Sequence, residues 1–170
     1  PYVFHMEEDW EFYKEGFIEA CLDVIDLDDD NDGVNDEADR CPETPGDASN
    51  NGCPKLEEMN FNAKNVTFVS GSSVLTKKAE AELVNLIAVL NKYSKISINI
   101  DGYTDNSGNA SANLLLSQSR AEAVKKYLVA KGIDASRLFA SGYGQQKPVA
   151  ENTTPAGKAQ NRRVEFSVRN

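Results

Sequence analysis

The sequence predicts an α/β protein: a β-α-β-α-β-β sandwich with a mixed sheet and helices on one face, preceded by a small acidic module. Strand-like and helix-like patterns alternate over residues 60–170, as expected where helices pack on a sheet. The charge is divided as well, because residues 1–60 carry a net charge of −16 and residues 61–170 one of +7. We therefore expect a helix within 1–25, an acidic repeat over 26–56 and an α/β domain over 60–170.

The first segment is predicted to be helical over residues 7–25. Apolar side chains recur there at intervals of three and four, which gives a helix one apolar stripe. They are Trp10, Tyr13, Phe17, Cys21 and Val24. The role of this helix stays open: it could pack on the acidic repeat, mediate homodimerisation, or be in part foreign sequence. Cys21 is either a buried thiol or half of an intermolecular disulfide.

The acidic repeat has the spacing of a calcium-binding loop. Residues 26–39 hold eight carboxylates, which repel one another unless a cation or solvent intervenes. Asp28, Asp30 and Asp32 alternate, a glycine follows at once, and Asp39 stands eleven residues after Asp28, so alternate side chains can converge on one ion around a sharp turn. The candidate calcium ligands are Asp28, Asp30, Asp32, the carbonyl of Val34, Asp36 and Asp39.

Two features depart from an EF-hand. The last position is Asp39 rather than a bidentate glutamate, and Cys41-Pro42 leaves little room for an exit helix. With its Cys-Pro ending, the pattern resembles a thrombospondin type-3-like repeat, and that resemblance also implies bound calcium. A disordered acidic linker is the competing interpretation, since acidic composition rich in Asn and Gly commonly produces one.

The α/β domain is predicted from periodicity. Ile96, Ile98 and Ile100 alternate with polar residues, which indicates a strand buried on one side. Apolar residues at helical spacing predict helices over 76–93 and 111–131. The other strands are predicted at 65–69, 138–143 and 164–168.

The second predicted helix has two faces. Asn113, Ser117 and Arg120 are spaced four and three apart and share a polar face. The core side is predicted to be Leu114, Ala121, Val124 and Leu128. Asp105 lies in the loop before this helix, so Asp105 and Arg120 could flank one pocket for the ammonium and carboxylate of an amino acid. The plainer interpretation is an ion pair between them that stabilises the loop.

Several short motifs of this domain follow one another in a fixed order. They are Asn99-Ile-Asp-Gly-Tyr-Thr-Asp105, Asn113-Leu-Leu-Leu-Ser117, Ser119-Arg-Ala121, Gly142-Tyr-Gly144, Pro148, Asn152-Thr153 and Gln160-Asn-Arg-Arg-Val164. Their order and spacing resemble the OmpA-like C-terminal domain over roughly residues 60–170. The resemblance implies the same fold and non-covalent binding of peptidoglycan. It also implies a periplasmic domain that ties the outer membrane of a Gram-negative bacterium to the cell wall.

The resemblance implies roles for individual residues as well. In that family an aspartate, and an arginine fifteen residues on, hold the ammonium and the carboxylate of diaminopimelate in the peptide stem; Asp105 and Arg120 match this pair. The other ligand-contacting positions match Thr104, Ser107, Asn113 and Arg162. Tyr103, Val69 and Lys158 depart from the commoner family pattern, which leaves the pair intact but could alter the preference among stem peptides.

Cys41 and Cys53 are predicted to be bonded to each other. Each precedes a proline, and the segment between them is too rich in turn formers for a helix or strand. The periplasm implied by the family resemblance is also an oxidising compartment. Metal binding by cysteine is disfavoured, because there is no CxxC spacing and the one histidine is His5.

Several classes of function are disfavoured. The chain has no Gly-x-Ser-x-Gly or His-Glu-x-x-His motif, so we expect a binding protein and not an enzyme. Nucleic acid is a poor ligand, since no Lys/Arg cluster is interleaved with aromatics. No apolar run approaches the length of a membrane helix, so we expect membrane contact only through a segment upstream. The competing function is a protein–protein interaction module of an envelope complex that does not bind the wall.

Overall fold

The structure is a computed structural model, and the residues it describes are 30–46, 48–56 and 61–169. The predicted helix at 7–25, with Cys21, and the predicted ligand Asp28 lie outside them. The chain divides into two compact units, one ending at Cys53 and the other beginning at Pro54, and each is described by itself. Within the described part of the chain, no helix combines the length and the apolar character needed to cross a membrane.

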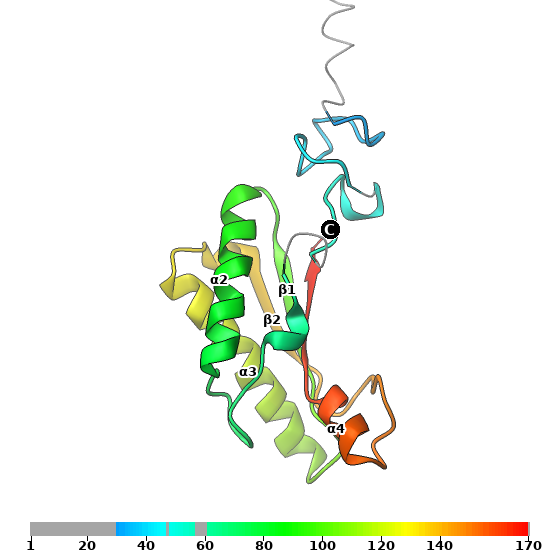
Figure 1. The fold of residues 1–170 in the computed structure, drawn as a ribbon, viewed down its shortest axis with the longest axis vertical. Coiled ribbons are helices and arrows are strands. Elements are labelled where there is room, and N and C mark those ends of the chain that lie inside the picture. Colours follow the sequence, from blue (N-terminus) through cyan, green and yellow to red (C-terminus); the bar gives the residue numbers. More distant parts are fainter. Residues whose placement is uncertain (1–29, 47, 57–60, 170) are drawn as a thin grey trace, which may run out of the picture. The chain divides into compact units, whose positions relative to one another are not determined.

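Helices and strands alternate in the second unit (Figure 1). In order they are η2 (Ala63–Asn65), α2 (Lys77–Lys92), β1 (Ile98–Gly102), α3 (Ala110–Ala130), η3 (Ala135–Arg137), β2 (Leu138–Gly142), α4 (Pro155–Asn161) and β3 (Val164–Val168). The strands are ordered β2-β1-β3, with β1 parallel to β2 and antiparallel to β3. This mixed sheet with its helices confirms the predicted α/β fold; helix α4 was not predicted.

The core lies where α2 and α3 cover one face of the sheet. Ile98 and Ile100 of β1 are completely buried, whereas the alternate residues Asn99 and Asp101 line an open groove. The helices contribute the completely buried Leu83, Leu86, Leu90, Val124 and Leu128. This burial of apolar side chains is the main source of stability for the unit.

The strand predicted at 65–69 is wrong. Its first residue ends helix η2, and the segment makes a single bridge, Phe68 with Leu75, outside the three-stranded sheet. The backbone N–H of Val69 donates to the carbonyl of Val74 at 2.9 Å, and Gly71 turns the chain at a φ of +67°. Turn chemistry in the Ser-Gly-Ser-Ser sequence therefore outweighs the β-propensity of Val-Thr-Phe-Val. We call residues 68–75 the hairpin.

Helix α3 buries Ala121, Val124 and Leu128 as predicted, but not Leu114. Leu114, predicted to lie in the core, is 47% exposed, and Asn113 and Ser117 are buried in its place. The reason is the close approach of α3 to the strands: a Cβ added to Gly102 would lie 2.3 Å from the carbonyl oxygen of Ser117. At this distance only small or polar side chains fit between the helix and the strand ends.

The outer edge of β2 is covered by side chains of α3. The Gln118 amide donates to the carbonyl of Ala140 at 3.3 Å and accepts from the N–H of Gly142 at 2.7 Å. Lys125 donates to the carbonyl of Leu138 at 2.7 Å. These contacts occupy backbone groups that an edge strand would otherwise offer to another chain.

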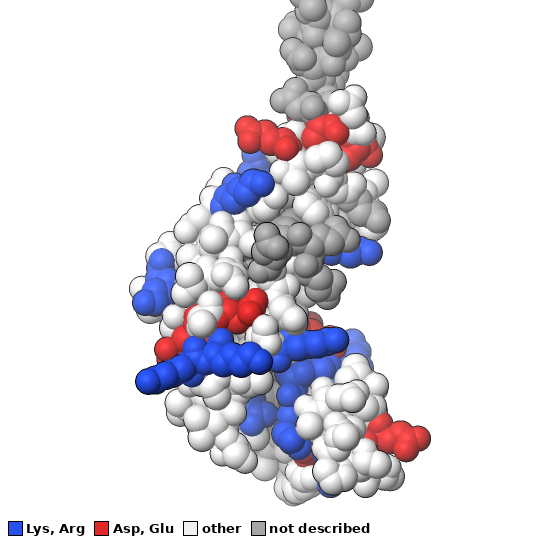
Figure 2. Space-filling view, in the orientation of Figure 1, with Lys and Arg blue, Asp and Glu red and all other residues white. Residues whose placement is uncertain are grey.

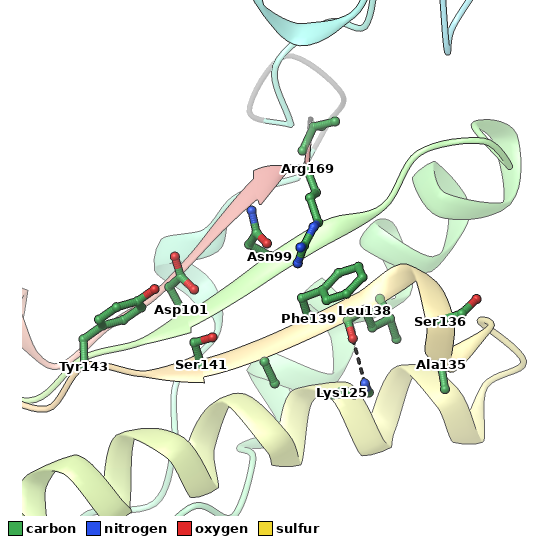
Figure 3. A pocket seen from close by; sticks show the side chains of 12 residues that line it. Asn99, Asp101, Lys125, Ala135, Ser136, Leu138, Phe139, Ser141, Tyr143 and Arg169 are labelled. Atoms are coloured by element: carbon green, nitrogen blue, oxygen red, sulfur yellow. Dashed lines mark hydrogen bonds between the residues drawn. The ribbon is translucent and has the colours of Figure 1, made fainter.

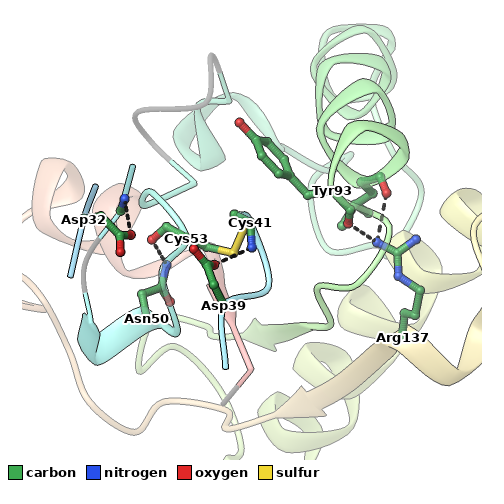
Figure 4. The surroundings of a disulfide bond; sticks show 9 residues. Asp32, Asp39, Cys41, Asn50, Cys53, Tyr93 and Arg137 are labelled. Atoms are coloured by element: carbon green, nitrogen blue, oxygen red, sulfur yellow. Dashed lines mark hydrogen bonds between the residues drawn. A yellow bond between two sulfur atoms is a disulfide. The ribbon is translucent and has the colours of Figure 1, made fainter. Parts of the chain in front are cut away.

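The first unit is held by turns and a disulfide (Figure 4). The predicted bond between Cys41 and Cys53 is present, with the Cα atoms 5.0 Å apart and both residues buried. Gly46 and Gly52 pack tightly here: an added Cβ would lie 2.2 Å from the backbone of Cys53 and from the carboxyl carbon of Asp39, respectively. The unit is compact without a regular α-helix or strand among its described residues.

Candidate functional site

The candidate ligand site forms where β1 ends and α3 begins. After β1 the chain continues into the buried residues Tyr103, Thr104 and Asp105. The backbone N–H of Thr104 donates to the carbonyl of Gly144 at 2.7 Å, which fixes this loop against the loop after β2. The predicted residues Thr104, Asp105, Ser107, Asn113 and Arg120 thus come together in one region, because one loop joins the strand to the helix that carries them.

Asn113 holds the loop in shape. Its side-chain amide donates to the carbonyls of Ser107, at 3.0 Å, and Asp105, at 3.3 Å. The hydroxyl of Thr104 donates to the same Asp105 carbonyl at 2.9 Å. Asn113 and Thr104 therefore satisfy buried backbone carbonyls of the loop, so their contacts in the structure are with the protein itself.

Asp105 is paired with Arg162, which lies 57 residues away. The guanidinium of Arg162 donates to one carboxylate oxygen at 2.7 Å, and the backbone N–H of Ser107 donates to the other at 2.8 Å. Burial by itself would raise the pKa of Asp105, but the hydrogen bonds from Arg162 and Ser107 outweigh it and hold the pKa below its ordinary value. Asp105 is therefore ionised at neutral pH.

Arg120 is a buried cation that makes no salt bridge within the described part of the chain. It is 6% exposed, and no carboxylate of the described residues forms a salt bridge with it. Its Nε donates to the carbonyl of Ser72 at 3.0 Å, and its guanidinium carbon lies 5.2 Å from the ring centre of Phe68. Burial lowers the pKa of Arg120, and Arg162 lowers it further while Asp105 raises it. An arginine still keeps its charge under such conditions.

The plainer interpretation, an ion pair between Asp105 and Arg120, is not found in the structure, where Asp105 pairs with Arg162 instead. Lys158 adds another cation, since its ammonium lies 3.0 Å from the hydroxyl oxygen of Ser107. Arg162 thus contacts the Asp105 carboxylate directly, and Arg120 and Lys158 add positive charge to the same region. Figure 2 shows Lys and Arg side chains gathered across this part of the second unit. The local excess of positive charge favours an anionic group in the site.

Asn161, which lies in the Gln160-Asn-Arg-Arg-Val164 motif, is a supporting residue of the site. It is completely buried; its oxygen accepts from the N–H groups of Val149 and Ala150, and its amide donates to Asn152 at 3.0 Å. The Asn152 side chain in turn accepts from the N–H of Asn106 at 3.3 Å. This network fixes the segment before α4, and so the helix whose end carries Arg162. The sequence signal for this role was the position of Asn161 directly before Arg162 and Arg163.

Tyr103, which departs from the commoner family pattern, is a packing residue. It is 2% exposed and stacks on Tyr143 with the ring centres 5.3 Å apart. The guanidinium carbon of Arg163 lies 4.0 Å from its ring centre. Burial raises the pKa of Tyr103 to about 12, so the phenol stays neutral.

A groove of about 800 Å³ lies elsewhere, on the open face of the sheet (Figure 3). Polar side chains of β1 and β2 line it, and the guanidinium carbon of Arg169 lies 3.7 Å from the ring centre of Phe139 at one side. Neither Asp105 nor Arg120 is among its lining residues. We therefore place the candidate ligand site at Asp105 and Arg120, on the chemistry of these side chains and not on the size of a cavity.

The candidate metal site lies in the first unit. Ligand oxygens of Asp30, Asp32 and Asp39 all lie within 4.8 Å of one another, and Asp39 is buried. Calcium–oxygen distances are about 2.3–2.6 Å, so two ligands of one ion lie at most about 5 Å apart. The three carboxylates therefore fit one calcium ion. Asp36 and Val34 are half-buried, and Asp36 is not part of this group of three.

Backbone geometry brings these carboxylates together. The N–H of Val34 donates to one oxygen of Asp32 at 2.8 Å, and the N–H of Gly46 donates to the other at 2.8 Å. The N–H of Cys41 donates to Asp39 at 2.6 Å (Figure 4). Gly33 has a φ of +86°, which supplies the sharp turn expected at this position.

Known proteins resemble this chain over the same region. The model of the OmpA family matches residues 67–162, which include Asp105, Arg120 and Arg162. The outer membrane porin F of Pseudomonas aeruginosa is 40% identical over 144 residues, covering 83% of this chain. The chain spans only 41% of that porin's length.

Two solved structures share the fold. The peptidoglycan-associated lipoprotein from Burkholderia pseudomallei has 34% identity and a TM-score of 0.58, covering 61% of this chain and 88% of that one. The cell wall anchor of the T6SS from Pseudomonas aeruginosa has 35% identity and a TM-score of 0.54, covering 59% and 73%. With the family model matching more than half of its residues, this chain belongs to the OmpA family.

Proposed function

We propose that the second unit binds peptidoglycan non-covalently, through the diaminopimelate of its stem peptide, and so holds an outer-membrane protein to the cell wall. Relatives described as a peptidoglycan-associated lipoprotein and as a cell wall anchor support this. The observation that carries the proposal is Arg120, a buried guanidinium without a carboxylate partner among the described residues. Burying a charge without a partner costs free energy. The presence of a buried Arg120 therefore favours a ligand that supplies the missing carboxylate.

The site can hold both charges of an amino acid. The two terminal nitrogens of Arg120 make no hydrogen bond within the described residues, and together they match the two oxygens of a carboxylate. The Asp105 carboxylate has lone pairs beyond those used by Arg162 and Ser107, and these can accept from an ammonium group. A zwitterionic ligand can thus pair its carboxylate with Arg120 and its ammonium group with Asp105, without displacing Arg162.

Retention on purified sacculi tests this function. We expect the wild-type chain to sediment with diaminopimelate-type sacculi and Asp105→Ala to stay in the supernatant. Removing one member of a buried charge–ligand contact costs about 2–5 kcal/mol. Arg120→Ala should fail in the same way while keeping its helical circular dichroism.

Arg169→Ala is the matched control, because it removes one positive charge beside the open groove and away from Asp105 and Arg120. It should sediment like the wild type. If the wild type does not sediment, or if Arg169→Ala is lost as readily as Asp105→Ala, the specific site is refuted. Sedimentation of none of the proteins would favour the protein–protein interaction module.

We also propose that the first unit binds one calcium ion through Asp30, Asp32 and Asp39, with Asp28, Asp36 and the carbonyl of Val34 as further ligands. The convergence of three carboxylates within 4.8 Å supports it. Calorimetric titration with calcium should give saturable heat, which Asp39→Asn should abolish. Absence of heat at millimolar calcium would contradict the proposal, and the wall-binding site of the other unit would be unaffected by that result.

A further inference from the structure

The hairpin, residues 68–75, makes its contacts to Arg120 with two different groups. Its backbone is closed by the Val69 to Val74 hydrogen bond of 2.9 Å and by the Ser72 N–H, which donates to the carbonyl of Val69 at 3.0 Å. This geometry turns the Ser72 carbonyl to the Nε of Arg120 and places the Phe68 ring 5.2 Å from its guanidinium carbon. The hairpin therefore contacts Arg120 at one edge and at one face.

The contacts limit how Arg120 can receive a carboxylate. A planar guanidinium binds a carboxylate bidentately in two ways: side-on, through Nε and one terminal nitrogen, or end-on, through both terminal nitrogens. The hydrogen bond from Nε to Ser72 uses the side-on edge. Only the end-on edge is left, and the contact with Phe68 restrains the plane of the group.

We propose that the hairpin is a positioning element of the ligand site: it fixes Arg120 so that a ligand carboxylate is received end-on, with Phe68 and the Ser72 carbonyl as the positioning groups. This rests on the proposed function, and it assigns a role to a segment that contributes none of the predicted ligand contacts. Pre-organisation of a flexible arginine lowers the entropy lost when the ligand binds, so the hairpin contributes to affinity without touching the ligand.

Variants of the hairpin in the full chain test the inference. Phe68→Leu keeps an apolar side chain but removes the aromatic ring, and it should weaken binding of free diaminopimelate roughly three- to thirtyfold. Phe68→Tyr restores the ring and should bind within about twofold of the wild type. Gly71→Val strains the turn at its φ of +67° and should weaken binding by moving the Ser72 carbonyl.

Phe139→Leu is the control, because it removes the ring of another arginine–aromatic contact, that with Arg169. It should bind diaminopimelate like the wild type. Equal affinity of Phe68→Leu and the wild type, in folded proteins with the same melting temperature, would overturn the inference.

A measurement without ligand separates the inference from the proposed function. The Nε–H of Arg120 should exchange slowly with water in the wild type, since it is bonded to Ser72, and fast in Phe68→Leu and Gly71→Val. If the wild type binds no diaminopimelate but shows this difference in exchange, the proposed function fails and the positioning role of the hairpin stands. Fast exchange in the wild type would overturn the inference whatever the binding result.

Discussion

The two charged clusters among the described residues are opposite in sign. In the first unit, Asp30, Asp32 and Asp39 bring like charges within 4.8 Å, and backbone N–H groups are the hydrogen-bond donors to Asp32 and Asp39. In the second unit, Asp105 has its own cation in Arg162, whereas Arg120 is buried and makes no salt bridge with a carboxylate of the described residues. The first cluster is a group of carboxylates, and the second holds a buried guanidinium that makes no salt bridge with a carboxylate of the described residues. Each cluster therefore indicates the charge of its ligand.

The largest expected effect is the loss of stability of the first unit when its disulfide is removed. Replacing Cys41 and Cys53 with serine removes the bond that closes the loop between them, and the loop-entropy estimate gives a loss of about 3 kcal/mol. The first unit should lose its calcium affinity, while the second unit unfolds at its wild-type temperature. Calorimetric titration with calcium measures the affinity of the first unit, and differential scanning calorimetry measures the unfolding temperature of the second. A lowered melting temperature of the second unit would show that the units depend on each other.

Calcium should stabilise the first unit by mass action. At about one hundred times the dissociation constant, a bound ion adds about 2.7 kcal/mol to the free energy of unfolding. The gain should vanish in Asp39→Asn, because Asp39 is the buried carboxylate of the cluster. Limited proteolysis with calcium and with chelator measures it. Equal cleavage rates in residues 30–53 under the two conditions would count against a calcium site.

Arg120→Met should separate stability from binding. It removes an uncompensated buried charge and keeps a long side chain, so the free energy of unfolding should stay level or rise by about 1 kcal/mol. Sacculus binding should be lost in the same protein. Urea unfolding of the second unit measures the first quantity. A loss of several kcal/mol would mean that Arg120 is mainly a structural residue.

The smallest effect is the pH dependence of the Asp105–Arg162 pair. The folded-state pKa of Asp105 is below the ordinary value of 3.8, so the pair stabilises the fold above pH 3.8 and this contribution is lost as pH falls through the lower folded-state pKa. Because the Arg162 side chain is 46% exposed, the contribution is below about 1 kcal/mol. Arg162→Ala should raise the pKa of Asp105. A carboxyl titration by NMR that gave equal pKa values would contradict this.

The regions also differ in how far the sequence could predict them. The spacing of Asn113, Ser117 and Arg120 placed them on one face of α3, and the Cys-Pro loop gave the correct disulfide, because both patterns are local. The same local logic misplaced Leu114. The close approach of α3 to Gly102 and Gly142 is a tertiary feature, and it buries Asn113 and Ser117 in the first part of the helix, where Leu114 was expected.

Contacts between residues distant in the sequence could not be predicted from the sequence alone. The pairing of Asp105 with Arg162 joins residues 57 positions apart, and no periodicity specifies which of several arginines comes close to a given carboxylate. The bond from Arg120 to the Ser72 carbonyl spans 48 positions and ends on a backbone atom. Side-chain patterns give no information about such an acceptor, so residues 65–69 were predicted as a strand and the hairpin was given no part in the site.

Titration of free diaminopimelate into the wild type and Arg120→Lys, at low salt and at ~0.5 M salt, distinguishes a specific guanidinium–carboxylate contact from attraction to a basic surface. We expect the wild type to bind at both salt concentrations. Arg120→Lys should lose most of its affinity, because an ammonium cannot reproduce the planar two-point contact of a guanidinium. If Arg120→Lys binds like the wild type, and salt removes the binding of both, the site is only a basic surface and the proposed contact with Arg120 is refuted.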